Sequence, residues 1–428
     1  MLNKETCSFE TLEGRAACEI YYLHSRKFKT VTVKAFLLGR LDRDVEEEAI
    51  LPFILKRGTG TYPSLALISR KLESLYGTKL SLDTLKLGER QIFVTVLDMV
   101  NERLLPSGEG LLKDGIGVLN DVLTNPRVDK GSFPEEKFAG EKRNLVRLIR
   151  SQINDKGVYA NIRLVEEMFK GEPFGKFQWG DADRVARLDS ARTWSFYRNF
   201  IASAPAVFYV VGDVDRKKAR EMATTLFDGI NRCVAPGAPP ETTRSGGKGE
   251  VIEEEQPLEQ SKLVMGFNVE RNCTDEDYFA LFFYNSILGG GSYSKLFKNV
   301  REKESLAYYA HSAYDKVKGF LRIGAGIHRD NRDRVLEIVA EQMDDIAKGR
   351  ITAEEFSNAR KALLSGLRGV QDSPSQLIDY HLVTSLSGRE TGLDRIMNKL
   401  EKVKPEHVVA AARLVSPGKT FFLKGTAG

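Results

Sequence analysis

The sequence predicts an α+β protein built from two copies of one unit, and an internal repeat is the first observation behind this prediction. Residues 293–308 repeat residues 62–77 in a single ungapped register. The same register sets the alternating run 30–33 against 261–264, so it extends from a predicted strand into a predicted helix. Such self-similarity indicates a duplicated structural unit. The identical pairs include Tyr62 with Tyr293, Arg70 with Arg301 and Glu73-Ser74-Leu75 with Glu304-Ser305-Leu306.

Chain length is the second observation. At 428 residues the chain is longer than one hydrophobic core usually supports, so at least two domains are expected. We place the first repeat at 1–228 and the second at 257–428. The intervening residues 229–256 are rich in Pro and Gly and poor in large apolar side chains, which is typical of an exposed linker. We therefore expect two homologous α+β domains, each a sheet packed with helices, that form half of a clamshell chamber.

Hydrophobic periodicity predicts the individual elements. Two-residue alternation or a run of β-branched and aromatic residues predicts strands, whereas apolar residues three and four positions apart predict helices. The acidic run 46–48 precedes a short helix that ends at Gly58, because carboxylates favour helix N-termini and glycine favours helix exits. Strands are expected at 19–23, 29–38, 91–97, 206–213 and 420–423, and helices at 65–75, 108–123, 135–153, 161–169, 190–202 and 219–227.

Composition and charge argue against several functions. Hydrophobic residues make up 42% and charged residues 29% of the chain, as in ordinary globular proteins. The 64 basic and 59 acidic residues nearly balance and form no basic stripe, which argues against nucleic-acid binding. No apolar run reaches the roughly 20 residues of a membrane helix, and residues 1–7 lack the features of a signal peptide. Four scattered cysteines without a CxxC pair favour free thiols, so we expect a cytoplasmic protein.

Two motifs resemble the pitrilysin/insulinase family of zinc metallopeptidases. Residues 51–64, followed by 72–77, are similar to the first repeat of that family, and residues 288–308 are similar to its second repeat. The similarity extends over nearly the whole chain. It implies a peptidase chamber in which the zinc, the catalytic base and an Arg/Tyr pair come together.

The zinc motif of that family is absent from this sequence. Active members carry H-x-x-E-H, in which two His bind Zn²⁺ and the Glu activates water. The corresponding positions hold Ala49, Pro52 and Phe53, and the position of the third ligand, seven residues after Glu141, holds Leu148. No HxxH or HxxxH pair offers a replacement. We therefore predict no catalytic zinc and no other cofactor, and treat all five histidines as solvated or core-packed: His24, His311, His328, His381 and His407.

The Arg/Tyr pair of the family is retained as Arg301 and Tyr308. The resemblance implies that these residues hydrogen-bond the backbone of a bound peptide and help to hold the tetrahedral oxyanion. Arg is a permanent cation with several donors, and a phenol is a neutral donor, so both suit developing negative charge. The alternative interpretation is a surface arginine and a core tyrosine with no ligand.

The triple glycine 289–291 is open to two interpretations. Glycines after an apolar helix can end it at left-handed dihedral angles, or they can let a peptide backbone approach closely. We favour the helix-end interpretation and keep peptide contact as the second.

These features predict a non-catalytic subunit of a heterodimeric zinc metallopeptidase. The resemblance implies that the catalytic groups can be divided between a zinc-bearing and a zinc-less subunit, and this sequence has the second profile. Its expected partner is a zinc-containing paralogue with an intact H-x-x-E-H motif, and a homodimer is the other assembly left open. A peptide would bind by adding a strand to a sheet edge. By itself the chain is expected to be an inactive homologue, without nucleic acid or membrane as partner.

Two other hypotheses remain. The chain can be a structural or peptide-binding scaffold with no proteolytic role, as the core subunits of the mitochondrial respiratory complex suggest for this fold. A metal-independent peptidase is the weaker hypothesis, because the sequence contains no recognisable nucleophile constellation.

Overall fold

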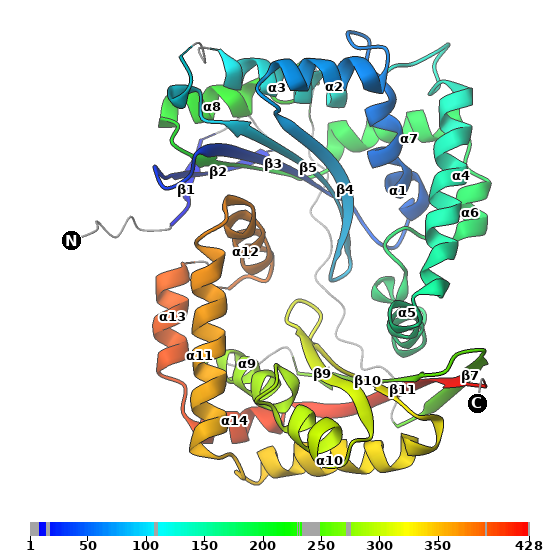
Figure 1. Ribbon diagram of the computed structural model, residues 1–428. Coiled ribbons are helices and arrows are strands. Elements are labelled where there is room, and N and C mark those ends of the chain that lie inside the picture. The colour runs from blue at the N-terminus through cyan, green and yellow to red at the C-terminus, as the bar shows by residue number, and fades with distance from the viewer. Residues whose placement is uncertain are drawn as a thin grey trace. The chain divides into compact units, whose positions relative to one another are not determined.

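The computed structural model describes residues 8–13, 18–106, 110–228, 230, 232, 249–270, 275–389 and 392–426 (Figure 1). The chain divides into two compact units, each of which combines three segments. The first unit contains Met1–Arg150, Phe177–Pro240 and Gln371–Val383, and the second contains Ser151–Lys176, Glu241–Val370 and Thr384–Gly428.

Six strands form the sheet of the first unit, in the order β1-β2-β6-β3-β5-β4. β2 and β6 run parallel, and all other neighbours are antiparallel. β6 is buried along its whole length, as its uninterrupted apolar sequence predicts. The strands are β1 (Glu10–Leu12), β2 (Cys18–His24), β3 (Thr30–Leu38), β4 (Lys79–Leu87), β5 (Arg90–Val100) and β6 (Ala206–Gly212).

Helices of the first repeat cover one face of this sheet and form the main hydrophobic core with it. Alternate residues of β3, Val31, Val33 and Ala35, point into that core. The helices are α1 (Val45–Ile54), α2 (Leu65–Ser74), α3 (Leu111–Thr124), α4 (Glu135–Ser151), α6 (Ala182–Ala186), α7 (Ser190–Ser203) and α8 (Arg216–Thr225), with 3-10 turns η1 (Leu55–Arg57) and η2 (Glu102–Leu104).

The opposite face of the first sheet carries α12 (Pro374–Leu386), which comes from the second repeat. Lys34 Nζ on β3 lies 2.7 Å from a carboxylate oxygen of Asp379. The Tyr209 hydroxyl on β6 lies 2.9 Å from His381 Nδ1. Burial lowers the pKa of His381 to about 4, so this imidazole packs as a neutral core residue.

Five strands form the sheet of the second unit, in the order β7-β11-β8-β10-β9. The helix α5 (Lys156–Met168), from the first repeat, packs with Val264, Phe320 and Phe421 in a separate core on this sheet. The strands are β7 (Val251–Gln256), β8 (Ser261–Val269), β9 (Ala307–Asp315), β10 (Phe320–Ile327) and β11 (Val415–Gly425). The other helices are α9 (Asp275–Gly289), η5 (Phe297–Lys303), α10 (Arg332–Ala347), α11 (Ala353–Val370), α13 (Leu393–Glu401) and α14 (Pro405–Ala412), with 3-10 turns η3 (Gln152–Asn154), η4 (Pro173–Gly175) and η6 (Arg329–Asn331).

The two sheets repeat one topology. β2-β6-β3-β5-β4 and β7-β11-β8-β10-β9 have the same succession of one parallel and three antiparallel pairings. β3 and β8 lie in the register that the sequence repeat predicts. The predicted α+β class is confirmed. The compact units do not coincide with the predicted repeats 1–228 and 257–428, because each unit includes one helix from the other repeat: α12 in the first unit and α5 in the second. The repeat boundaries therefore stay a prediction.

Most of the predicted linker 229–256 lies outside the described residues. Its last six residues form β7, which pairs in parallel with β11. The acidic run Glu253-Glu254-Glu255 at the end of the predicted linker therefore belongs to a sheet. Glu253 lies 2.8 Å from Arg332, and Glu255 lies 2.8 Å from Lys424, so ion pairs fix these carboxylates at the sheet edge.

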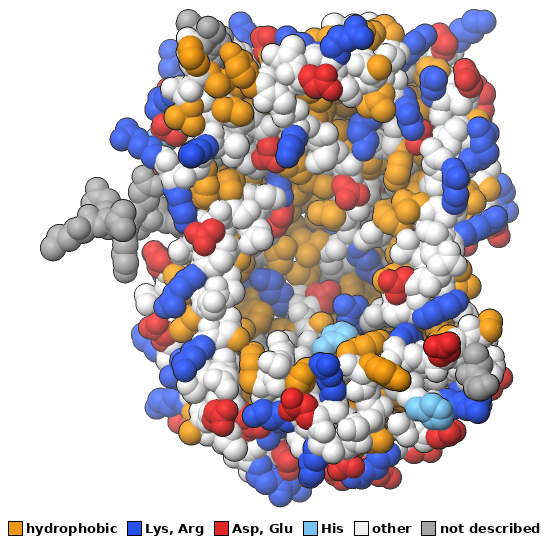
Figure 2. Space-filling model, viewed as in Figure 1, with side chains coloured by type: hydrophobic (Ala, Val, Ile, Leu, Met, Phe, Trp, Pro, Cys, Tyr) orange, Lys and Arg blue, Asp and Glu red, His pale blue; other side chains and the backbone are white. Residues whose placement is uncertain are grey.

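Helices in the described parts of the chain are all too short or too polar to span a membrane. Basic and acidic side chains are interspersed on the visible face in Figure 2, as the nearly balanced charge predicts.

Candidate functional site

The helix α1 holds the positions where a zinc motif would lie. Ala49 is fully buried, and Pro52 is buried inside the helix, where the ring removes one backbone N–H donor. Phe53 packs against the main hydrophobic core, and Leu148 on α4 packs against the same core. Hydrocarbon side chains thus occupy all four positions, and within the described residues no cluster of three His, Cys, Asp or Glu side chains can hold a metal ion.

Glu141 on α4 retains a charge partner beside this apolar region. It is only 4% exposed, and its carboxylate forms an ion pair with Arg57 from the turn after α1. Asn144 Nδ2 lies 3.3 Å from the other carboxylate oxygen. A buried carboxylate needs such compensation. The guanidinium of Arg57 therefore supplies the positive charge that compensates the buried Glu141 carboxylate.

The acidic residues at the start of α1 are buried, which the sequence did not predict. Glu46 accepts a hydrogen bond from the Asp181 backbone N–H at 3.1 Å, and Glu47 pairs with Arg192 at 3.1 Å. Glu48 is 2% exposed, and its Oε1 has no hydrogen-bond partner in the described structure. Burial, reinforced by the nearby Asp44, raises the pKa of Glu48 well above its usual range. Burial therefore favours the neutral, protonated form of Glu48 in the folded protein.

Arg301 lies on η5, a seven-residue π-helix. Such wide helical turns are rare and often occur at functional sites. The Arg301 guanidinium carbon lies 4.7 Å from the centroid of the Phe297 ring, one turn earlier. Arg301 is exposed, and none of the described acidic side chains forms an ion pair with it. Its donors therefore face solvent, which agrees with a ligand-binding arginine.

Tyr308 lies at the start of β9 and its side chain is 74% exposed. The alternative of a core tyrosine is therefore wrong for this residue. β9 is the last strand of the second sheet, so no described strand pairs with its outer edge. The chain reaches β9 from η5 through Ser305, whose φ of 50° is left-handed. This conformation is costly for a residue other than glycine.

The triple glycine does not end α9 at left-handed dihedral angles. None of Gly289, Gly290 and Gly291 has a positive φ. Close packing requires the first two glycines instead: a Cβ on Gly289 would lie 2.4 Å from the Ser312 backbone nitrogen, and a Cβ on Gly290 would lie 2.7 Å from the Ser286 Cα. Gly289 lets the end of α9 approach β9, and Gly290 lets the chain fold back against the last turn of α9. α9 does end at Gly289, but the predicted left-handed dihedral angles are wrong, because interatomic distance and not backbone handedness excludes a side chain.

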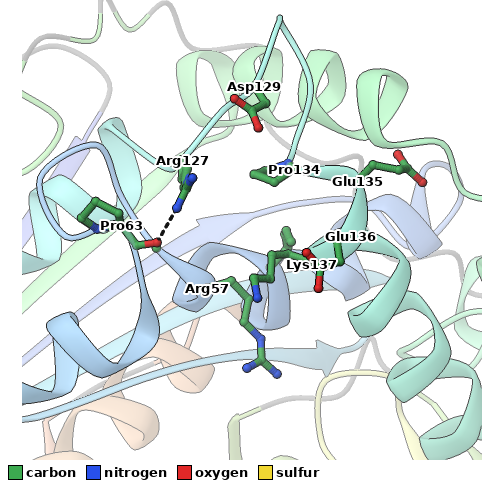
Figure 3. A pocket seen from close by; sticks show the side chains of 10 residues that line it. Arg57, Pro63, Arg127, Asp129, Pro134, Glu135, Glu136 and Lys137 are labelled. Carbon is green, nitrogen blue, oxygen red and sulfur yellow. Dashed lines mark hydrogen bonds between the residues drawn. The ribbon is translucent and has the colours of Figure 1, made fainter.

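A cavity of about 200 Å³ adjoins the end of α1 in the first unit (Figure 3). Arg127 donates a hydrogen bond of 2.9 Å to the Pro63 carbonyl at its edge. Basic and acidic side chains line this cavity in equal number, so the net charge of the lining favours neither anions nor cations. The lining residues are Ile54, Arg57, Gly58, Pro63, Arg127, Asp129, Pro134, Glu135, Glu136 and Lys137.

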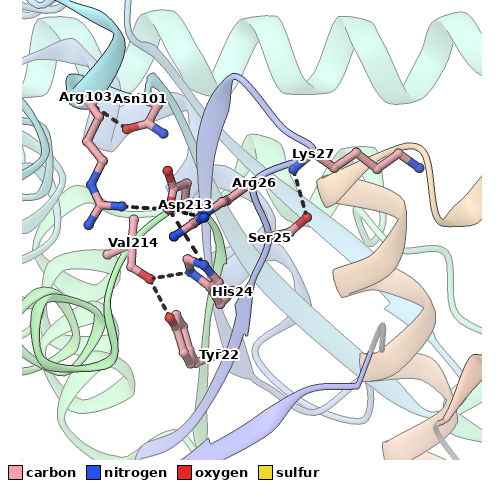
Figure 4. A network of polar contacts seen from close by, with 9 residues as sticks. All are labelled: Tyr22, His24, Ser25, Arg26, Lys27, Asn101, Arg103, Asp213 and Val214. Atoms are coloured by element: carbon pink, nitrogen blue, oxygen red, sulfur yellow. Dashed lines mark hydrogen bonds and ion pairs between the residues drawn. The ribbon is translucent and has the colours of Figure 1, made fainter. Parts of the chain in front are cut away.

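A polar network lies at the ends of β2 and β6 (Figure 4). The Val214 carbonyl accepts hydrogen bonds from the Tyr22 hydroxyl and from His24 Nδ1, the latter at 3.0 Å. The Asp213 carboxylate lies 2.8 Å from Arg103 and 4.0 Å from Arg26. These polar groups pair with one another. The network therefore holds the loops that follow β2 and β6 together and does not resemble an open binding site.

The fold and these positions define a class: a metallopeptidase-like protein of two α+β repeats whose metal position is filled with hydrocarbon. Residues 187–363 match the family described as "Peptidase M16 inactive domain". The chain is 32% identical over 409 residues to the probable inactive metalloprotease YmfF of Bacillus subtilis, which covers 95% of this chain and 96% of that protein. The chain belongs to the peptidase M16 family, the pitrilysin/insulinase family of its sequence motifs, and lacks the zinc motif of that family.

Two further similarities extend the comparison. The crystal structure of a conserved protein from Enterococcus faecalis V583 superposes with a TM-score of 0.89, covers 98% of this chain and 99% of that one, and is 25% identical. The B. subtilis protein YmxG, described as an uncharacterized zinc protease, is 29% identical over 168 residues, which are 38% of this chain and 41% of that protein. Similarity to YmxG is therefore confined to part of each chain.

Proposed function

We propose that this protein is the non-catalytic subunit of a heterodimeric zinc metallopeptidase and that it supplies Arg301 and Tyr308 to the site of a zinc-bearing partner. One contrast carries the proposal. The metal positions are apolar and buried or partly buried, whereas Arg301 and Tyr308 are exposed and have no hydrogen-bond or ion-pair partner among the described residues. Exposed donors add little to packing, because water satisfies them, but they suit a ligand that brings its own acceptors.

The chemistry of the pair fits a peptide backbone. A peptide carbonyl becomes an oxyanion when water attacks it, and donors aimed at that oxygen stabilise the transition state more than the ground state. Arg301 supplies a permanent positive charge and Tyr308 supplies a neutral hydroxyl. The unpaired outer edge of β9 offers backbone groups to which an extended peptide can add as a strand.

The proposed partner is a paralogue with an intact H-x-x-E-H motif. YmfF and YmxG come from the same B. subtilis strain, so one genome holds a relative described as inactive and a relative described as a zinc protease. This distribution supports an assembly of unlike subunits over a homodimer.

Co-expression with the zinc-bearing paralogue tests the proposal. The purified pair is assayed with a quenched fluorogenic peptide, and Arg301→Ala or Tyr308→Phe should lower kcat/KM by about a hundredfold, the usual effect of losing one oxyanion donor. Arg368→Ala on α11 and Tyr76→Phe after α2, which are also exposed, serve as matched controls and should leave kcat/KM unchanged.

The outcome also separates this function from a scaffold role. If the pair forms but Arg301→Ala and Tyr308→Phe are as active as the controls, the chain does not complete the site. A scaffold would then be the better description. If the zinc-bearing subunit alone matches the activity of the pair, complementation is excluded.

A further inference from the structure

The π-helix η5 is tied to its neighbours by buried polar side chains. Asn299 Nδ2 lies 3.0 Å from the Lys295 backbone carbonyl and 2.8 Å from Gln342 Oε1 on α10. Gln342 is only 7% exposed. One side-chain amide therefore joins the backbone at the start of the wide turn to a fixed acceptor on another helix.

A second tie lies just before η5. Lys295 Nζ lies 3.1 Å from Glu355 Oε1, and the side chains are 8% and 10% exposed. The Glu355 carboxylate also accepts a hydrogen bond of 2.9 Å from the Thr352 backbone N–H at the start of α11. Buried charges that are paired in this way hold one geometry, because any displacement leaves a charge without compensation.

A π-helix needs such support, because its wide turn is less favourable than an α-helix. The equivalent helix of the first repeat, α2, is an ordinary α-helix whose Ser64 side chain accepts from the Leu67 N–H. η5 differs by its wide turn, whereas a left-handed residue follows both helices: Tyr76 after α2 and Ser305 after η5. Widening a turn changes the direction of every side chain after it, including Arg301.

We propose that Asn299 is a positioning residue: its amide, held by Gln342, fixes the π turn that directs Arg301 towards a bound peptide. The inference rests on the proposed function, in which Arg301 binds the peptide carbonyl. Asn299 itself does not touch the peptide. Loss of its amide should let the turn relax towards α-helical geometry and rotate Arg301 away from the position that its function requires.

Kinetics on the co-expressed pair test the coupling to Arg301. Asn299→Ala should lower kcat/KM for the fluorogenic peptide about tenfold, as expected when the Arg301 hydrogen-bond donor is displaced by less than about 1 Å. In the Arg301→Ala background the same substitution should cause no further loss. Asn161→Ala on α5 is the matched control, since Asn161 Nδ2 also donates to a carbonyl four residues earlier, at 2.8 Å, and this variant should retain full activity.

Gln342 provides a second pair of variants. Gln342→Glu keeps an acceptor for Asn299 and should retain activity, whereas Gln342→Met removes that acceptor and should behave like Asn299→Ala. If Asn299→Ala lowers kcat/KM equally in the parent protein and in the Arg301→Ala variant, Asn299 only stabilises the fold and the proposal is wrong.

A crystal structure of the Asn299→Ala protein decides the positioning role independently of peptidase activity. The expected result is a shortened π turn and an Arg301 guanidinium no longer stacked on Phe297. If η5 keeps its seven π-helical residues and the stacking is unchanged, positioning by Asn299 is refuted. If Arg301→Ala alone has no kinetic effect, the proposed function fails, but this structural result still answers the question about Asn299.

Discussion

Helices α2 and η5 stand at equivalent places in the two repeats, and their differences show how one duplicated element can diverge. Arg70 on α2 and Arg301 on η5 occupy matching positions of the sequence repeat. α2 is a regular α-helix, whereas η5 is a π-helix pinned by Asn299 and Gln342. The first copy kept the conformation that local hydrogen bonding favours. The second copy kept a conformation that only tertiary contacts can maintain.

A second contrast concerns polar groups. Around α1, the positions of a zinc site have become hydrocarbon and pack against the main core. Around η5 and β9, Arg301 and Tyr308 are exposed, and none of the described groups pairs with their donors. Apolar replacement removes buried groups that would need partners, so it stabilises the first region. The exposed donors of the second region add little to stability, so they are available to a ligand.

The largest effect should come from restoring a ligand to the apolar region. Ala49→His places an imidazole where the side chain is fully buried, so overpacking and an unpaired polar group should together cost about 3–5 kcal/mol of unfolding free energy. Urea unfolding followed by circular dichroism measures the loss. Ala49→Ser, with little added volume, is the control and should cost much less. Full stability of Ala49→His would mean that the region is not tightly packed.

A smaller effect, with a pH dependence, should come from Glu48. Its pKa is raised in the folded protein but ordinary, near 4.5, in the unfolded chain. The neutral form therefore stabilises the fold at low pH, and this contribution is lost as pH rises from 4.5 through the folded pKa. Glu48→Gln should be more stable than the parent at pH 8, by on the order of 1–3 kcal/mol, with a smaller difference near pH 4.

The comparison for that experiment is Glu47→Gln: burial also raises the pKa of Glu47, but Arg192 pairs with its carboxylate, so we expect a smaller change in stability at pH 8. Urea midpoints at both pH values give the comparison. A Glu48→Gln variant that is less stable than the parent at pH 8 would show that an ionised Glu48 has a partner.

A still smaller change should follow from relieving the backbone after η5. Ser305→Gly removes the cost of a left-handed conformation and should stabilise the protein by up to about 1 kcal/mol, whereas Ser305→Val should destabilise it. Thermal unfolding measures both. If Ser305→Gly and Ser305→Val both raise or both lower the stability of the protein, the left-handed conformation assigned to Ser305 is wrong.

The smallest effect should be that of Tyr308→Phe on stability. Since Tyr308 is 74% exposed and its hydroxyl has no partner among the described groups, the free energy of unfolding should change by less than about 0.5 kcal/mol. This result, together with the large kinetic effect proposed for the same variant, would separate binding from packing in the second region. A loss above 1 kcal/mol would indicate a structural role.

Several features followed from local patterns alone. The fully buried β6 has an uninterrupted apolar sequence, and the helical segment formed by α1 and η1 ends where Gly58 follows it. The absence of the zinc motif could be predicted from the sequence, because metal binding needs specific ligand atoms at fixed spacing. In contrast, the exchange of α5 and α12 between the compact units could not be predicted, because an amphipathic helix shows which face it buries but not which sheet covers that face.

The sequence by itself determined the duplication, the α+β class and the loss of the metal ligands, because each depends on periodicity or on the chemistry of single side chains. Only the tertiary structure decided which polar groups are satisfied. Glu48 without a partner, Glu141 with Arg57, and Asn299 with Gln342 all depend on distances between residues remote in the chain. The close approach of Gly289 to β9 is of the same kind, since a glycine in sequence does not reveal whether its backbone angle or its neighbour requires it.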